Sequence, residues 1–169
     1  QVRELILPNG TMRRIVSYGV SSYGYDIRLG NIFKFLKGDP AKELDPKIIP
    51  AGLYQTIRAD NVVVVPPHGV MLGQSLEYFK IPRDILTLCF GKSTYARCGL
   101  LVNVTPFEPE WEGFATIAIN NLSSNPVRVY AGEGIAQLIF LQSDQICAVS
   151  YADKKGKYQA QKEITTAKV

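Results

Sequence analysis

Short apolar segments rich in β-branched and aromatic residues recur along the chain, and proline or glycine interrupts them every few residues. Turn signals at this spacing are typical of sandwiches and barrels, and not of folds in which strands alternate with helices. The sequence therefore predicts an all-β domain with one short helix at residues 93–99, capped by the Ser93 side chain. The ten predicted strands are NIFKFL, LYQTIR, NVVVVPP, GVMLGQSLEYFKIP, DILTLCF, LLVNVTPF, FATIAINNL, PVRVYA, IAQLIFL and QICAVSYA.

Length and composition favour a single domain spanning residues 1–169 in a reducing compartment. The three cysteines are Cys89, Cys98 and Cys147, and none stands in a C-x-x-C pair that would indicate a zinc site. A net charge of +4 is modest, so we expect anionic small molecules and no nucleic acid as partners. No apolar stretch reaches the length of a membrane span and no signal peptide is visible, so we expect a cytoplasmic protein. The chain begins with Gln1 and not Met, so we expect an N-terminal piece to be missing.

The letters GKST near the middle of the chain also end the P-loop of nucleotide hydrolases. Leu86 stands where the first glycine of a P-loop would be, and no long amphipathic helix follows, so that interpretation is excluded. The alternative is a short turn in which Lys92, Ser93, Thr94 and Arg97 could hold phosphates or polarise a carbonyl-like group. An ordinary capped turn whose arginine bonds a carboxylate explains the same letters.

Three other stretches place polar residues in apolar or terminal surroundings. Asp26 lies among aromatic and β-branched residues and is expected to be a buried carboxylate that holds a turn or pairs with Arg28. Gln137 lies in an apolar strand, as a core glutamine with satisfied hydrogen bonds would. The C-terminal stretch YADKKGKYQAQ reads either as a solvated tail or as a ligand-binding segment, and His68 reads as a structural turn residue.

The strand FATIAINNL is expected to have one core face and one outward face, because strand side chains alternate. The outward face is predicted to carry Phe114, Thr116 and Ala118, and the core face Ala115, Ile117 and Ile119.

Five motifs in this order closely resemble those of the dCTP deaminase family, which is related to the trimeric dUTPases: SSYGYDIRLGN, GKSTYARCGL, NVTPFEPEWEG, GIAQLIF and YADKKGKYQAQ. The resemblance implies a distorted jelly-roll or β-barrel of the dUTPase type and a homotrimer with active sites between subunits. It implies hydrolysis of dCTP to dUTP and ammonia without zinc, with Mg²⁺ bound through the triphosphate. It also implies dUTP or dTTP as product or inhibitor.

The resemblance assigns roles to individual residues. Ser93 would bond the reacting centre, Arg97 would orient groups beside it, and Glu108 would lie near the base. Residues 151–169 would form a lid over the phosphates. The implied nucleotide-binding residues are Lys92, Ser93, Thr94, Tyr95, Ala96, Arg97, Glu108, Thr116, Ile117, Ala118, Gln137, Tyr151, Lys157 and Gln161.

One departure from the family pattern concerns the catalytic base. The family strand reads roughly T-I-E-I-S-N, and its glutamate is the general base, whereas this chain reads TIAINN with Ala118 at that position. The chain is then either an engineered inactive variant or a homologue that binds without turnover. Two further alternatives are a dUTPase-type or bifunctional deaminase-diphosphatase, and a non-catalytic nucleotide-sensing module. The glycine-rich C-terminal motif of dUTPases is absent.

Overall fold

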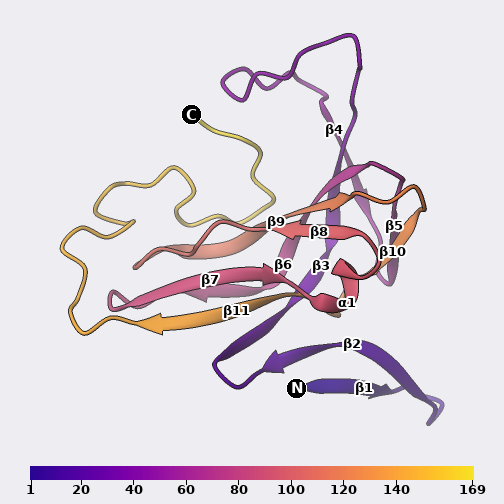
Figure 1. Ribbon diagram of the computed structural model, residues 1–169, viewed down its shortest axis with the longest axis horizontal. Helices are drawn as coiled ribbons and strands as arrows, with labels where there is room; N and C mark the ends of the chain where they lie inside the picture. Colours follow the sequence, from indigo (N-terminus) through magenta and orange to yellow (C-terminus); the bar gives the residue numbers. More distant parts are fainter.

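The computed structural model describes residues 1–169 as eleven strands and one four-residue helix (Figure 1). The prediction of an all-β fold is confirmed. The elements are β1 (Val2–Ile6), β2 (Met12–Val20), β3 (Gly24–Leu36), β4 (Tyr54–Arg58), β5 (Val62–Val65), β6 (Val70–Lys80), β7 (Ile85–Gly91), α1 (Ser93–Ala96), β8 (Leu100–Asn103), β9 (Glu112–Asn121), β10 (Val127–Tyr130) and β11 (Gly134–Gln142). No helix in the chain is long and apolar enough to cross a membrane.

One strand prediction is wrong, and one pair of strands was not predicted. The stretch QICAVSYA forms turns and bends, because its carbonyls at Cys147 and Ala148 accept hydrogen bonds from the Arg83 guanidinium and no strand pairs with it. The N-terminal hairpin of β1 and β2 was not predicted, because its charged and apolar residues form no regular alternating run.

The long strand β3 joins two groups of strands (Figure 1). Its first half pairs with β2 and β11, and its second half pairs with β4 and β6. From β6 the ladder continues to β9 and β8, while β11 continues to β7, and every pairing is antiparallel. A second sheet contains only β5 and β10. This arrangement is the expected distorted jelly roll.

The core lies between these groups of strands and contains one cluster of 20 buried apolar residues. Strand β9 shows the predicted alternation over its whole length, since every second residue is buried. Ile117 and Ile119 are fully buried, whereas Thr116 and Ala118 are only partly buried on the opposite face. The two-faced prediction for this strand is therefore confirmed.

The C-terminal segment, residues 151–169, runs back along the starting end of β9 (Figure 1). Gln161 forms a parallel bridge with Gly113, and the Phe114 N–H donates to the Gln161 carbonyl (2.9 Å). The Trp111 indole N–H donates to the Tyr158 carbonyl (2.9 Å), and Ile164 is 2% exposed. The alternative of a solvated tail is therefore wrong for this segment as far as Ile164.

Candidate functional site

The turn that follows β7 is anchored by Tyr95 and leaves its polar residues exposed. Tyr95 is buried, its hydroxyl oxygen accepts the Tyr130 N–H (3.3 Å), and burial raises the pKa of its phenol. The N-cap residue is Lys92, and no side chain caps the helix, so the predicted Ser93 cap is wrong. Ser93 occupies the first helical position, where its hydroxyl is free to meet a ligand. Thr94 and Ala96 are exposed beside it.

Arg97 lies against its own turn and binds no carboxylate. Its guanidinium donates to the Ser93 carbonyl (3.0 Å), and the side chain is exposed. The alternative interpretation, a capped turn whose arginine pairs with an acid, is therefore not what the structure shows. A cation and a hydroxyl remain together at the surface, available to a bound molecule.

Lys92 points inward, away from the exposed side of the turn. Its ammonium pairs with the Asp26 carboxylate and donates to Ser17 Oγ (3.1 Å). The expected pairing of Asp26 with Arg28 is wrong, because Glu77 on β6 accepts both the Arg28 Nε–H (2.8 Å) and its backbone N–H (3.0 Å). The prediction that Asp26 is buried is confirmed, since this residue is 1% exposed.

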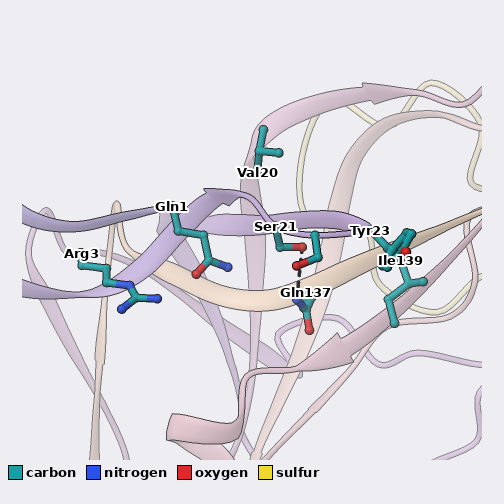
Figure 2. A pocket seen from close by; sticks show the side chains of 8 residues that line it. Gln1, Arg3, Val20, Ser21, Tyr23, Gln137 and Ile139 are labelled. Carbon is teal, nitrogen blue, oxygen red and sulfur yellow. Dashed lines mark hydrogen bonds between the residues drawn. The ribbon is translucent and has the colours of Figure 1, made fainter.

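Gln137 faces a cavity of about 660 Å³ and is not part of the core (Figure 2). Its side-chain amide donates to Ser21 Oγ (3.3 Å), and in the ladder Gln137 pairs with Asp26 on one side and Phe90 on the other. Figure 2 shows Gln1 and Tyr23 on either side of this hydrogen bond. We call Gln137 and residues 92–97 the turn cluster.

Thr94 of the turn cluster lines a second cavity, of about 670 Å³, at the N-terminal hairpin. Arg3, Arg13 and Arg14 line it as well. Glu133, which is 3% exposed, pairs with Arg13 (2.7 Å), and Glu4 also lines the cavity, so three guanidinium groups face two carboxylates. An anionic group bound near Thr94 would therefore meet a lining with one excess positive charge.

A second group of predicted site residues gathers around the outward face of β9 and the C-terminal segment. Thr116 Oγ1 accepts the Thr165 N–H (3.1 Å), and the Gln161 amide donates to the Phe114 carbonyl (3.4 Å). Ala118 lies on the same face of β9, in register with Leu72 of β6 and Asn103 of β8. We call this group the tail cluster, and its members are Glu108, Thr116, Ala118, Tyr151, Lys157 and Gln161.

The remaining members of the tail cluster are held by residues of the segment itself. Glu108 pairs with Lys154, and the Tyr151 hydroxyl oxygen accepts the Tyr158 N–H (3.0 Å). The exposed Lys157 ammonium lies 5.4 Å from the centre of the Tyr158 ring. These contacts shape the segment as a folded unit that carries an exposed cation.

The turn lies at one end of β9, whereas the tail cluster extends from the other end of the strand to its middle, where Thr116 and Ala118 lie. The C-terminal segment meets β9 at Gly113, whereas the turn meets its far end, where the Leu122 N–H donates to the Gly99 carbonyl (2.9 Å). From Gly113 to Asn121 the strand spans about 26 Å at a rise of about 3.3 Å per residue. The structure of one chain therefore does not bring all of the predicted site residues together.

Two predicted nucleotide-binding residues have side chains that face the core. Ile117 is fully buried and Tyr95 is 3% exposed, so each could meet a ligand only through its backbone. Nowhere in the chain do three His, Cys, Asp or Glu side chains come close enough to hold a metal ion. The Mg²⁺ expected with the triphosphate stays a prediction.

Arg83 is a functional candidate that sequence reasoning missed. Its guanidinium binds Glu110 (2.7 Å) and Asp153 (2.7 Å), and so ties the C-terminal segment to the body. The Ser150 N–H and Arg83 together lower the pKa of the Asp153 carboxyl. No local pattern marks Arg83, because its partners are distant in the sequence. The only local signal is that Arg83 follows Pro82, at the end of a predicted strand.

Comparisons with known proteins first identify the class of fold. A 2'-deoxycytidine 5'-triphosphate deaminase from Agrobacterium tumefaciens matches with a TM-score of 0.59 at 17% identity, over 72% of this chain and 39% of that chain. The native dUTPase of EIAV matches with a TM-score of 0.52 at 15% identity, over 79% of this chain and 89% of that one. At these identities the likeness shows the fold, which is the dUTPase-like fold.

Sequence comparison then identifies the family. A family described as dCTP deaminase-like matches residues 2–143. A dCTP deaminase of Acidobacterium capsulatum is 54% identical over 155 residues, which cover 92% of this chain and 84% of that protein. A dCTP deaminase of Chlamydia abortus is also 54% identical, over 92% of this chain and 81% of that protein. The chain belongs to the dCTP deaminase-like family.

Proposed function

We propose that this protein binds dCTP and has the architecture of a dCTP deaminase, which converts dCTP and water to dUTP and ammonia. The observation that carries the proposal is the identity of 54% to proteins named dCTP deaminase, over 92% of the chain. The exposed turn of Ser93, Thr94 and Arg97 supports it, because this turn offers hydroxyls and a cation free of any acidic partner.

The turn would act on the base and the phosphates. Ser93 Oγ would hydrogen-bond the reacting centre, and the Arg97 guanidinium would orient and stabilise the group that gains charge when water adds to C4. Thr94, beside a cavity lined by three arginines and two glutamates, would face the phosphates. Mg²⁺ would accompany the triphosphate and neutralise part of its charge. Ammonia then leaves from C4 as the carbonyl forms.

With Ala118 in place of the glutamate of the family pattern, the proposed reaction lacks its general base. The attacking water must lose a proton and the departing amine must gain one, so one carboxyl group would act first as general base and then as general acid. Ala118 lies on the outward face of β9 beside Thr116, and a methyl group cannot accept a proton. We propose that this chain binds dCTP and turns it over very slowly.

Calorimetry with dCTP and a product assay test this proposal together. We expect saturable binding of dCTP and almost no release of ammonia or deoxyuridine nucleotide. The absence of dCTP binding would contradict the proposal. Release of dUMP and pyrophosphate from dCTP would instead indicate a bifunctional enzyme, and their release from added dUTP alone would indicate a diphosphatase.

We also propose that the complete site forms between copies in a homotrimer. The separation of the turn from Gln161, which bridges Gly113 at the other end of β9, supports this proposal. The outward face of β7 and β11 offers an uncovered apolar surface, with Leu86, Phe90 and Leu141 each more than a third exposed. Closed rings of identical subunits commonly bury such faces.

Mixing two inactive variants tests the shared site directly. One variant carries Ala118→Glu with Arg97→Ala, and the other is the chain with Ala118 and an intact Arg97. If the site is shared, mixed trimers contain sites that combine Glu from one copy with Arg97 from its neighbour, and deamination appears on mixing. Activity that stays absent in verified mixed trimers would place both groups in one subunit, and a monomer in sedimentation would contradict the trimer.

A further inference from the structure

Asp26 is a buried carboxylate beneath the turn cluster, and it is not among the predicted site residues. Its side chain is 1% exposed, and Lys92 is the only cation that pairs with it. Lys92 is also the N-cap residue of α1. The ion pair therefore joins β3 directly to the residue from which the turn starts.

The Lys92 ammonium is already committed to the protein. It donates to Asp26 and to Ser17 Oγ (3.1 Å), and its side chain is 11% exposed. The Lys92 backbone N–H donates to the Ile135 carbonyl (3.3 Å), which fixes the same residue to β11. A side chain held in this way has little surface left to offer to a phosphate.

We infer that Asp26 is a positioning residue for nucleotide binding and that Lys92 acts through this pair and not as a phosphate ligand. The inference rests on the proposed function, since the turn that the pair holds would be the nucleotide-binding turn. Ser93 and Arg97 follow Lys92 closely in the same turn, so a displaced N-cap would move both of them. Asp26 itself would never touch the nucleotide.

The two roles for Lys92 predict different effects on nucleotides with different numbers of phosphates. If Lys92 contacted the outer phosphates, its loss would weaken dCTP binding and leave dCMP binding almost unchanged. If it positions the turn, its loss weakens both nucleotides by the same factor. Asp26→Asn should then do the same, because it leaves the buried ammonium without its counter-charge and releases the turn.

A matched control is available on the same strand. Arg28 lies two residues from Asp26 and pairs with Glu77, whose side chain is 14% exposed, without contacting the turn. Glu77→Gln therefore removes a partly buried ion pair from β3, whereas Asp26→Asn removes a buried one, and it leaves the turn in place. Both substitutions should lower the melting temperature, and only Asp26→Asn should weaken nucleotide binding.

The experiment measures dCTP and dCMP affinity by calorimetry for the unaltered chain and for Asp26→Asn, Lys92→Met and Glu77→Gln. We expect roughly tenfold weaker binding of both nucleotides to the first two variants, the scale of one charged hydrogen bond. The double variant Asp26→Asn/Lys92→Met should be no weaker than the weaker single variant, since the two residues act as one pair.

Three outcomes would overturn the inference: unchanged affinity in Asp26→Asn, a loss in Lys92→Met confined to dCTP, or an equal loss in Glu77→Gln. If the unaltered chain binds neither nucleotide, the proposed function fails instead. Amide hydrogen exchange without nucleotide then still tests the positioning role. Exchange in residues 93–97 should accelerate in Asp26→Asn and not in Glu77→Gln, and equal rates would overturn the inference.

Discussion

Restoring a carboxylate at residue 118 should turn this protein into an active deaminase. The substitution Ala118→Glu places the acid on the outward face of β9, two residues and about 6–7 Å along the strand from Thr116. Its neighbours across the ladder are Leu72 and Asn103, so the new side chain lies on a partly buried surface with an apolar residue on one side. Partial burial should raise the pKa of the new carboxyl toward a value useful for a base.

The expected gain in rate follows from what a general base contributes. General-base catalysis contributes about 10²–10⁴-fold, so we expect kcat to rise by at least about 100-fold. That factor corresponds to about 2.7 kcal/mol of transition-state stabilisation. The affinity for dCTP should change little, because the turn cluster is untouched.

The assay follows deoxyuridine nucleotide by chromatography, and ammonia as the second product, at saturating dCTP. Ala118→Gln is the matched control, because its amide has nearly the same shape as the glutamate side chain and cannot accept the proton. The glutamine variant should stay as slow as the unaltered chain. Brisk deamination by the unaltered chain would refute the reasoning, and so would an inactive glutamate variant that folds and binds dCTP. The latter result would favour a nucleotide-sensing module.

Three further predictions concern stability and reactivity. Arg83→Ala should release the C-terminal segment and speed its proteolysis, because the variant lacks the ion pair with Asp153. The same ion pair should weaken in acid: the pKa of Asp153 is lowered from 3.8, so the stability that its carboxylate contributes is present above pH 3.8 and is lost as the pH falls through the lowered value. Hydrogen exchange of residues 153–165 would show this loss. Maleimide at pH 8 should label the exposed Cys98 and spare Cys89, because burial raises the pKa of the Cys89 thiol to about 12. Mass spectrometry would locate the label, with Cys98→Ser as the control. Ile117→Ala should destabilise the fold by about 2–5 kcal/mol in urea unfolding, and Ile117→Val by only about 0.5–1.5 kcal/mol.

Local alternation and turn residues predicted the strands, because these features depend only on residues that are close together in the sequence. The alternating letters of β9 were enough to assign Ile117 to the core and Ala118 to the outward face. The hairpin of β1 and β2 escaped prediction, since most of β2 pairs only with β1 and the hairpin needs no continuous apolar face.

Long-range partners could not be predicted from the same letters. Asp26 was expected to hold a turn or to pair with Arg28, the nearest cation in the sequence, but Glu77 on the neighbouring strand β6 binds that guanidinium. Lys92, 66 residues away, is the partner of Asp26. Which cation reaches a buried carboxylate depends on which strands become neighbours, and the sequence leaves that open.

The two clusters illustrate why motifs that occur in the expected order along one chain need not form one site within that chain. The third motif leads into β9, whose start lies beside the C-terminal segment while its end lies beside the turn. A strand of ten residues keeps its two ends apart, whatever the rest of the fold does. A second copy removes this obstacle, because a ring of identical subunits can set the turn end of one chain against the tail end of the next at every interface. In the proposed ring, the number of sites would therefore equal the number of interfaces.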